Sequence, residues 1–461
     1  MTEISSIKIE NILKAQKAFQ ASHQTKNLDF RIDMLKKLKL AVSQNEDRIL
    51  EALWKDLNKS AEEAYLTEIS ILNKEIDFHI KNLKKWGQPQ KVANPLHLFP
   101  STGKIYYEPL GVVLIIAPWN YPFQLVMNPL VGAIAAGCCV ILKPSESTAH
   151  IARVMDEMIR STFDENYIAL IQGGQRVGED LLKQRFDKIF FTGSTKVGKI
   201  VMKAAAENIT PVILELGGKS PGIVDENADI DIAAKRIAWG KTINAGQTCI
   251  APDYLLVHHA VKEELIEKIS VYLEEMHGED MQESEFYARI VHEKAFDTLV
   301  ELLEQSEGNI RYGGTFNREE LFLHPTIVDG ISPETDSLMQ EEIFGPILPV
   351  ITFTNLGEAI SFINSREKPL ALYYFGKRKQ AKEVIRKTSS GGVCINDTLM
   401  HIANHHLPFG GVGNSGFGIY HGKESFLAFS NPKAILNTPT WMDISFKYAP
   451  FKYFKFIKKF L

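Results

Sequence analysis

Apolar residues in the first part of the chain recur every three or four positions. One such stripe consists of Leu28, Ile32, Leu35 and Leu38, and a second consists of Tyr65, Ile69, Leu72, Ile76, Ile80 and Leu83. This spacing places the apolar side chains on one face of a helix, so both segments are predicted to be helical. Gly87, Pro89 and Pro95 follow closely and predict an end to the helical region there.

Beyond residue 110 the pattern changes to short, almost fully apolar runs separated by helical stretches. The first series of runs covers 112–116, 139–142, 168–171, 188–191 and 212–214, and a second covers 254–257, 348–353, 371–375 and 392–395. Fully apolar strands alternating with helices are typical of parallel sheets that are covered on both faces. The chain is therefore predicted to have two α/β domains.

Size and composition agree with a large globular protein. The chain has 461 residues, of which 45% are apolar and 23% charged, and this length predicts two or three domains. A net charge of −4 does not favour a nucleic-acid partner. The first residues lack a basic region followed by an apolar one. The longest apolar stretch, 130–142, is shorter than the about 20 residues that cross a bilayer, so we expect a cytoplasmic protein.

The four cysteines, Cys138, Cys139, Cys249 and Cys394, have no metal-ligand spacing and favour a reducing compartment. Cys249 lies in a loop, 244–252, between a helical run (229–241) and an apolar run (254–257). On this stretch alone the favoured interpretation is a small buried hydrophobic residue. The alternative is a reactive thiol presented from a rigid turn.

Two turns of the first series carry a candidate hydrogen-bond donor, Asn120, and a candidate proton acceptor, Glu215. In 117–122, Pro118 and Pro122 hold Asn120 in place, and a fixed amide donor suits an oxyanion site. The equally weighted alternative is that Asn120 caps a helix that begins near Pro122. Glu215, at the end of the fifth run, is predicted to be a desolvated general base. Its alternative is a structural ion pair with Lys219.

Other turns favour a nucleotide. Lys143 ends the second run at the edge where open α/β sheets bind nucleotides, and Glu146 follows it as a possible ribose acceptor. Without context, a surface lysine beside a solvated glutamate is the better interpretation. The turn Gly193–Ser194 opens a helix toward an anion, although its spacing is a weak signal by itself. The pair Glu342 and Phe344 suits a ribose and a ring face.

Taken together and in this order, these segments resemble the motifs of the aldehyde dehydrogenase superfamily. The match spans nearly the whole chain and comprises 117–122, 143–146, 191–198, 214–218, 246–249, 342–346 and the glycine-dense loop 408–418. Within the superfamily the chain is similar to class 3 enzymes, because it is short at its N-terminal end and carries similar stretches at 396–397 and 405–409.

The resemblance implies roles for ten residues. For catalysis these are Cys249 as nucleophile, Glu215 as general base, and Asn120 as oxyanion donor together with the backbone N–H of Cys249. For the cofactor they are Lys143 and Glu146 at the adenosine ribose, Gly193, Ser194 and Trp119 at the pyrophosphate, and Glu342 and Phe344 at the nicotinamide ribose. The cofactor is expected to be NAD or NADP, with NAD slightly favoured because Glu146 would repel a 2′-phosphate.

The resemblance also implies an aldehyde dehydrogenase fold. A Rossmann-like cofactor domain is expected at 1–86 and 110–216, an α/β catalytic domain at 217–424, and a small β oligomerisation element at 87–109 and 425–445. Class 3 relatives lead us to expect a homodimer that accepts medium-chain, long-chain or aromatic aldehydes.

The expected reaction is oxidation of the aldehyde to the carboxylic acid through a thiohemiacetal and a thioester on Cys249. Either the site lowers the pKa of this thiol or Glu215 helps to deprotonate it. One alternative is transfer of the acyl group to coenzyme A, which Glu215 disfavours because acylating relatives usually lack that base. A cysteine hydrolase would need a histidine partner, and a catalytically silent binding protein would not need all of Cys249, Glu215 and Asn120.

Two features stand outside this picture. His401, His405 and His406 could suggest a metal site, but loop histidines are more often structural, and we expect no metal. The tail, 446–461, carries five lysines among aromatic residues. It could contact an anionic membrane surface, but packing of its aromatic side chains on a neighbouring domain is the favoured interpretation.

Overall fold

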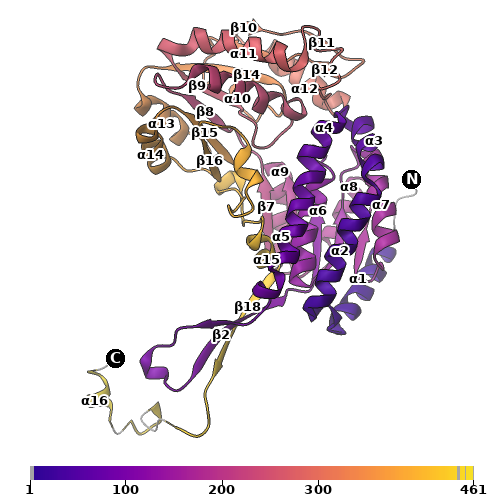
Figure 1. Ribbon diagram of the computed structural model, residues 1–461, viewed down its shortest axis with the longest axis vertical. Helices are drawn as coiled ribbons and strands as arrows, with labels where there is room; N and C mark the ends of the chain where they lie inside the picture. The colour runs from indigo at the N-terminus through magenta and orange to yellow at the C-terminus, as the bar shows by residue number, and fades with distance from the viewer. Residues whose placement is uncertain (1–4, 444–446, 452, 460–461) are drawn as a thin grey trace.

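The computed structural model describes residues 5–443, 447–451 and 453–459. Two α/β lobes lie beside each other, and a long β arm projects away from them (Figure 1). The N-terminal helices are α1 (Ser6–Ala21), α2 (Leu28–Gln44), α3 (Glu46–Leu57), α4 (Ala61–Ala64) and α5 (Ser70–Trp86). The stripe from Leu28 to Leu38 lies on α2 as predicted, and α5 ends at Trp86, directly before the predicted break.

The second stripe is predicted correctly only from Ile69 onward. Ile69, Leu72, Ile76 and Leu83 are buried, but Tyr65 is 40% exposed. The cause is a π-helical turn at Tyr65–Ile69, closed by a bond from the Ser70 N–H to the Tyr65 carbonyl. The extra residue in this turn shifts the helical phase, so residues before it no longer follow the stripe after it.

The first lobe is built on a six-stranded sheet with the order β17-β7-β6-β3-β4-β5. Its strands are β3 (Val112–Ile116), β4 (Cys139–Lys143), β5 (Ile168–Leu170), β6 (Lys188–Gly193), β7 (Val212–Leu216) and β17 (Gly416–Phe417). The first five are parallel, as predicted, and β17 joins β7 antiparallel. The connecting helices are α6 (Gln124–Ala136), α7 (Ala149–Thr162), α8 (Gln175–Leu182) and α9 (Thr195–Ala206). Helix α6 is buried throughout because α2 and α5 pack over it.

The second lobe is built on a seven-stranded sheet with the order β10-β13-β14-β9-β8-β15-β16. Its strands are β8 (Pro221–Val224), β9 (Tyr254–His258), β10 (Asn309–Tyr312), β13 (Thr326–Asp329), β14 (Ile347–Phe353), β15 (Ala371–Phe375) and β16 (Gly392–Ile395). Its helices are α10 (Ile230–Thr242), α11 (Lys262–His277), α12 (Glu293–Glu304), α13 (Leu356–Asn364) and α14 (Arg378–Lys387). All neighbouring pairs are parallel except β10 with β13. The predicted mixed α/β architecture with parallel sheets is confirmed.

The arm is a three-stranded antiparallel sheet. It pairs β2 (Thr102–Pro109) with β1 (Gln90–Val92) on one side and with β18 (Ser430–Asn437) on the other. Helix α15 (Lys423–Ala428) connects the arm to the body, where it packs on α6. The C-terminal tail, with the short helix α16 (Phe454–Ile457), lies near the tip of the arm (Figure 1).

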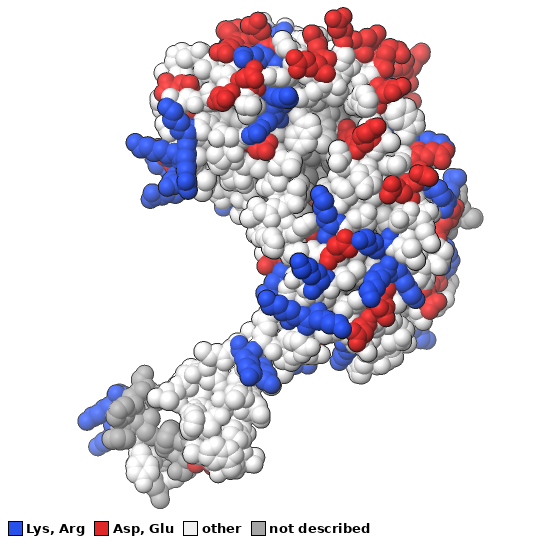
Figure 2. Space-filling view, viewed as in Figure 1, with Lys and Arg blue, Asp and Glu red and all other residues white. Residues whose placement is uncertain are grey.

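The favoured prediction for the tail is wrong within this chain. Tyr448, Phe451, Tyr453 and Phe454 are 51–62% exposed, so their rings do not pack on a neighbouring domain. Lysine side chains gather at the same end of the molecule in Figure 2. The predicted tail also includes 446, 452, 460 and 461, which lie outside the described residues. In the part of the chain that is described, no helix has the length and apolar character needed to cross a membrane.

Candidate active site

The turn that carries Cys249 has a backbone that few sequences tolerate. Helix α10 ends at Thr242, and a 3₁₀ turn at Ile243–Gly246 follows with Asn244 (φ 52°) and Ala245 (φ 51°) in the left-handed region. Gly246 also has positive φ, and a Cβ there would stand 2.4 Å from the carbonyl oxygen of Gly345. Such strain persists only where the surroundings impose it and is concentrated at functional sites.

Cys249 opens into a cavity of about 550 Å³ between the two lobes. The same cavity is lined by Glu215, Tyr121 and Thr192 from the first lobe. Burial raises the pKa of the Cys249 thiol, and the carboxyls of Glu342 and Glu215 raise it further. The backbone N–H groups of Cys249 and Ile250 lower this pKa, but burial outweighs them, which favours deprotonation of the thiol by a nearby base.

Glu215 is such a base by position and by environment. It belongs to β7, is 3% exposed, and neither carboxyl oxygen has a hydrogen-bond partner among the described residues. Lys219, its alternative partner in the sequence, bonds Asp253 instead at 2.5 Å. Burial holds the pKa of Glu215 well above its ordinary value. The structural ion-pair alternative is therefore wrong for Glu215. A buried carboxyl without a partner costs stability, which favours a chemical role for it.

Asn120 points toward the nucleophile turn. Its Nδ2 donates to the carbonyl of Gln247 at 3.0 Å, which fixes the orientation of the amide because only the NH2 end of the group can donate. The second N–H of the group remains to donate. The helix-cap alternative is wrong, because Glu68 accepts the N–H groups of Phe123 and Gln124 at the start of α6.

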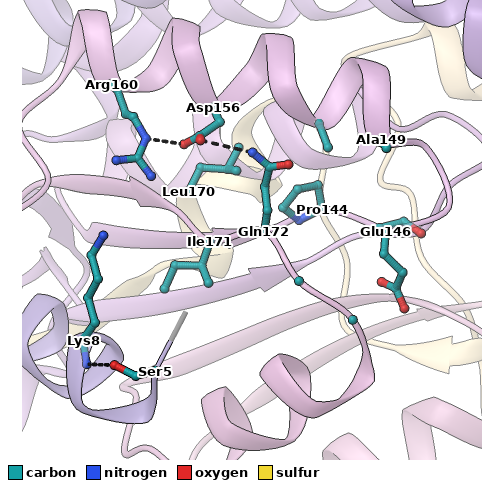
Figure 3. A pocket seen from close by; sticks show the side chains of 14 residues that line it. Ser5, Lys8, Pro144, Glu146, Ala149, Asp156, Arg160, Leu170, Ile171 and Gln172 are labelled. Atoms are coloured by element: carbon teal, nitrogen blue, oxygen red, sulfur yellow. Dashed lines mark hydrogen bonds and ion pairs between the residues drawn. The ribbon is translucent and has the colours of Figure 1, made fainter. Parts of the chain in front are cut away.

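Lys143 and Glu146 form a pair at the end of β4. Lys143 is 5% exposed and donates to Glu146 at 2.9 Å, so it is not the solvated surface lysine of the alternative interpretation. A second cavity, of about 730 Å³, begins at Glu146 and extends between α7 and the start of α1. Figure 3 shows Glu146 at one side of this cavity, with Lys8 and Arg160 at the other.

The turn after β6 leaves a helix N-terminus accessible. Gly193 ends the strand, and exposed Ser194 caps α9 by accepting from the Val197 N–H at 3.4 Å. The N–H groups of the first helical turn have no partner within a helix, which makes such a turn suited to phosphate. These residues fit the diphosphate of a dinucleotide.

Glu342, Phe344 and Trp119 are not among the residues that line the Cys249 cavity, although the Glu342 carboxyl is near enough to influence the thiol. A Cβ on Gly217 would stand 1.9 Å from the Glu342 carboxyl, so only glycine admits that side chain there. Burial, with a further contribution from Asp253, raises the pKa of Glu342 to about 8. The Trp119 ring makes an edge contact with Phe344 at 5.3 Å between centroids. This aromatic pair and the carboxyl fit the nicotinamide half of the cofactor.

Several lining residues were not predicted from the sequence. Tyr121 and Thr248, whose hydroxyls are 2.7 Å apart, adjoin predicted residues in the same motifs. We call the cavity into which Cys249 opens the substrate tunnel. Its apolar wall had no sequence signal, because the residues that form it come from five separate segments. It includes Leu66, Trp239, Phe286, Leu399, Met400, Ile402 and Phe409.

The loop histidines serve the fold. His405 Nδ1 lies 3.1 Å from Glu75, and His401 Nδ1 lies 3.2 Å from the Cys394 sulfur. Within the described ranges, no group of three or more His, Cys, Asp or Glu side chains is placed to hold a metal ion.

Comparison with known proteins agrees with this geometry. The model of the aldehyde dehydrogenase family matches residues 4–435. The chain is 50% identical to the 4,4'-diaponeurosporen-aldehyde dehydrogenase of Staphylococcus aureus, over 98% of this chain and 99% of that one. It is 45% identical to the dimeric NADP-preferring aldehyde dehydrogenase of Mus musculus, over 95% of each chain. A structure of Staphylococcus aureus AldH in a substrate-bound state superimposes with a TM-score of 0.96, at 50% identity, covering 98% of this chain and 99% of that one.

The expected resemblance to class 3 enzymes is confirmed by these relatives, which also include aldehyde dehydrogenase family 3 member B1 of Rattus norvegicus. NAD(P)-dependent oxidation of an aldehyde to a carboxylic acid is the activity that they support. The cavity joins the Cys249 thiol to the Glu215 carboxyl, which has no partner among the described residues, and the chain belongs to the aldehyde dehydrogenase family.

Proposed function

We propose that Cys249 is the nucleophile of this oxidation, Glu215 its general base and Asn120 its oxyanion donor. The observation that carries the proposal is the meeting of Cys249 and Glu215 in one cavity, where Glu215 has no other partner in the described structure. The Cys249 sulfur attacks the aldehyde carbon, and the resulting oxyanion accepts hydrogen bonds from Asn120 Nδ2 and the backbone N–H of Cys249. Donors of this kind each contribute about 3–4 kcal/mol.

When bound, oxidised NAD or NADP would supply the acceptor for the hydride of the tetrahedral carbon. The thioester left on Cys249 is then hydrolysed by a water molecule whose proton passes to Glu215. This role suits a carboxyl whose pKa is raised by burial, because such a group accepts a proton near neutral pH. Transfer to coenzyme A is not favoured, since the residue that activates water is present.

For the cofactor, we propose Lys143 and Glu146 at the adenosine ribose, and Gly193 and Ser194 at the diphosphate. Glu342 and Phe344 would hold the nicotinamide ribose. Trp119 lies against the Phe344 ring, which supports a position for Trp119 beside Phe344 rather than a separate contact with the diphosphate. We retain the division into a cofactor domain (1–86 and 110–216), a catalytic domain (217–424) and an oligomerisation element (87–109 and 425–445). The strands of the three larger sheets fall within these bounds, except that β17 belongs by sequence to the catalytic domain but joins the sheet of the first lobe.

The proposed substrate is a medium- or long-chain aliphatic aldehyde or an aromatic aldehyde. Leu66 (64% exposed), Phe286 (54%) and Met400 (48%) line the same cavity as Cys249, so together they offer apolar surface to an apolar ligand. Each methylene that these side chains bury adds about 0.8 kcal/mol to binding. The value of kcat/KM is therefore expected to rise about fourfold per methylene until the tunnel is filled.

The experiment follows reduced-nicotinamide absorbance over a series of straight-chain aldehydes and benzaldehyde, with NAD or NADP and with or without coenzyme A. Turnover without coenzyme A that is lost in Cys249→Ala is the expected result. Turnover that depends on coenzyme A would contradict the assignment of Glu215. An active Cys249→Ala variant would contradict the nucleophile, and preference for two-carbon aldehydes would contradict the substrate class.

We propose a homodimer that forms through the arm. Leu96 (89%), Phe99 (59%) and Leu436 (54%) expose apolar surface on it, and β18 is an edge strand open to a partner. Light scattering on the full chain should give a mass near twice 51.9 kDa. Leu96→Asp combined with Leu436→Asp should give monomers, whereas a monomeric unmodified chain would contradict the proposal.

We further propose that the tail contacts an anionic membrane surface. It has no acidic residue from 444 to 461, and its described aromatic rings are exposed beside Lys455, Lys458 and Lys459. The full chain should sediment with phosphatidylserine vesicles but not with phosphatidylcholine vesicles, and a chain ending at residue 443 should sediment with neither. Equal sedimentation of both chains would contradict it.

Four free cysteines are compatible with the proposed cytoplasmic location.

A further inference from the structure

A buried charged cluster stands behind the oxyanion site, on the segment that leads from α3 into α5. Lys59 and Glu68 form an ion pair at 2.7 Å, and neither side chain is exposed to solvent. Glu63 lies between them in sequence and lines the substrate tunnel. Burying an ion pair costs more than it returns in most proteins, so its presence here calls for a reason other than stability.

Each member of the cluster bonds to the backbone of the catalytic machinery. Lys59 Nζ donates to the carbonyl of Asn120 at 3.3 Å and also stands 4.4 Å above the ring of Tyr121. Glu68 accepts both N–H groups that open α6, at 2.8 and 3.1 Å, and so fixes the segment directly after Asn120.

Glu63 acts on the other half of the site. Its Oε1 accepts the N–H of Asn244 at 2.8 Å, from a residue 181 positions away. Asn244 is one of the two left-handed residues before Cys249, and its own side chain donates to the Asn120 carbonyl at 2.7 Å. Lys59 and the Asn244 side chain thus both donate to the Asn120 carbonyl, while Glu63 holds the backbone of Asn244.

The π-helical turn explains how one short segment supplies both carboxyls. In an α-helix, residues five apart point about 140° away from each other. The i→i+5 turn at Tyr65–Ile69 begins two residues after Glu63 and contains Glu68, and its wider winding brings residues at this spacing toward the same face. Glu63 reaches the N–H of Asn244 and Glu68 reaches the N–H groups at the start of α6, so the two carboxyls point toward the two segments that carry Cys249 and Asn120.

We propose that Lys59, Glu63 and Glu68 are a positioning set for the oxyanion site, with Lys59 and Glu68 fixing Asn120 and Glu63 fixing the turn before Cys249. The inference rests on the proposed roles of Cys249 and Asn120. None of the three residues takes part in bond making, and their effect is on the geometry of the addition step. A misplaced oxyanion donor slows chemistry without weakening the binding of the apolar chain.

The first test compares Glu63→Ala with Glu63→Gln. Alanine removes the acceptor of the Asn244 N–H, so kcat should fall about 10- to 100-fold while KM stays within about twofold. Glutamine keeps an oxygen that accepts this bond, so kcat should recover to within about threefold of the unmodified enzyme. Glu304→Ala, at an exposed glutamate of α12 that lines neither cavity, is the control and should keep its kcat.

The second test replaces the ion pair by a neutral pair of similar size, Lys59→Met with Glu68→Gln. Such replacements usually preserve folding, and glutamine still accepts from the start of α6. We expect about a tenfold slower pre-steady-state burst of reduced nicotinamide, with unchanged cofactor binding by tryptophan fluorescence. The exposed pair Lys55 and Glu51, joined at 2.5 Å, supplies the control through Lys55→Met with Glu51→Gln.

The outcomes separate the two levels of inference. Full kcat in Glu63→Ala, or equal losses in Glu63→Ala and Glu63→Gln, overturns the positioning set while leaving the assignment of Cys249 intact. An unchanged burst in the neutral-pair variant overturns the part assigned to Lys59 and Glu68. Retained activity in Cys249→Ala instead overturns the proposed function on which the inference rests.

Discussion

Two buried glutamates of this enzyme have nearly equal exposure, but their pKa values are shifted in opposite directions. Glu215 is 3% exposed and has no hydrogen-bond partner in the described structure, and burial holds its pKa well above the ordinary value. Glu75 is 2% exposed. Burial alone would raise its pKa as well, but the hydrogen bond from His405 and the charges of His79 and His421 outweigh burial and lower the pKa to about 2.

The difference lies in the partners. Glu75 also accepts from the Gly422 N–H at 2.8 Å and lies 3.5 Å from His79, so it joins α5 to the segment before α15. A carboxyl that is fully bonded stabilises a fold, and one that is left unbonded costs stability and remains available for proton transfer. The two residues therefore mark architecture and chemistry, respectively, and substitutions should affect stability in one case and rate in the other.

The largest effect is expected for Glu215→Gln. Removal of the proposed base should lower kcat by at least about 10³-fold, because hydrolysis of the thioester loses its proton acceptor. A burst of reduced nicotinamide, about one per active site, should remain, since the thioester still forms. The free energy of unfolding should change by less than about 1 kcal/mol, because the side chain made no bond that glutamine loses. Rapid-mixing absorbance and urea titration measure the two quantities, and normal steady-state turnover would contradict the assignment.

Glu75→Ala should show the reverse. Loss of a buried, bonded carboxylate leaves its partners unpaired and should lower the free energy of unfolding by about 3 kcal/mol. In the folded fraction, kcat should stay within about threefold, because Glu75 does not line the substrate tunnel. Urea unfolding and active-site titration provide the measurements. A hundredfold loss of kcat with unchanged stability would mean that the two carboxyls do not differ as described.

Acid should reveal the same cluster without a substitution at the active site. The folded pKa of Glu75 is lowered, so its stabilisation is present above the ordinary value near 4.5 and is lost as the pH falls toward 2. The pKa values of His79 and His421 are lowered, mainly by burial, so their protonation adds to the loss at low pH. Between pH 5 and 3 the unmodified enzyme should lose about 2 kcal/mol more than Glu75→Ala. Equal pH slopes in urea unfolding would exclude this role.

The sequence predicted the elements well and the environments poorly. Apolar runs located most of the parallel strands to within a few residues, because a strand buried on both faces needs an unbroken apolar stretch. The exceptions are β8 and β13, for which no run was predicted. The prediction that Tyr65 lies on the buried stripe was wrong because a π-helical turn changes the helical phase, and no composition marks such a turn. The tail failed because its aromatic residues would suit a core, a partner or a membrane equally well.

The candidate site divides in the same way. Cys249 and Glu215 could be singled out only by the order of motifs, because the structural interpretation is the favoured one for a lone cysteine and a common one for a lone glutamate. Glu75 and Glu63 had no motif at all. Their partners, Gly422 and Asn244, are far away in the chain, and local patterns do not report contacts between distant segments.

The smallest expected effect concerns a third carboxyl, Glu146, whose side chain is 53% exposed and paired with Lys143. If it faces the adenosine ribose, it repels the 2′-phosphate of NADP, and Glu146→Gln should raise the ratio of kcat/KM for NADP to that for NAD. Water screens an exposed charge, so the change should be near 1 kcal/mol, or about fivefold. Added salt should reduce the difference between the unmodified enzyme and the variant, because ions screen the repulsion further. Glu179→Gln, an exposed carboxyl on α8, is the control, and an unchanged ratio in Glu146→Gln would place the 2′-phosphate elsewhere. Unlike Glu215 and Glu75, this carboxyl remains largely in water, so its influence is limited to the choice between two cofactors.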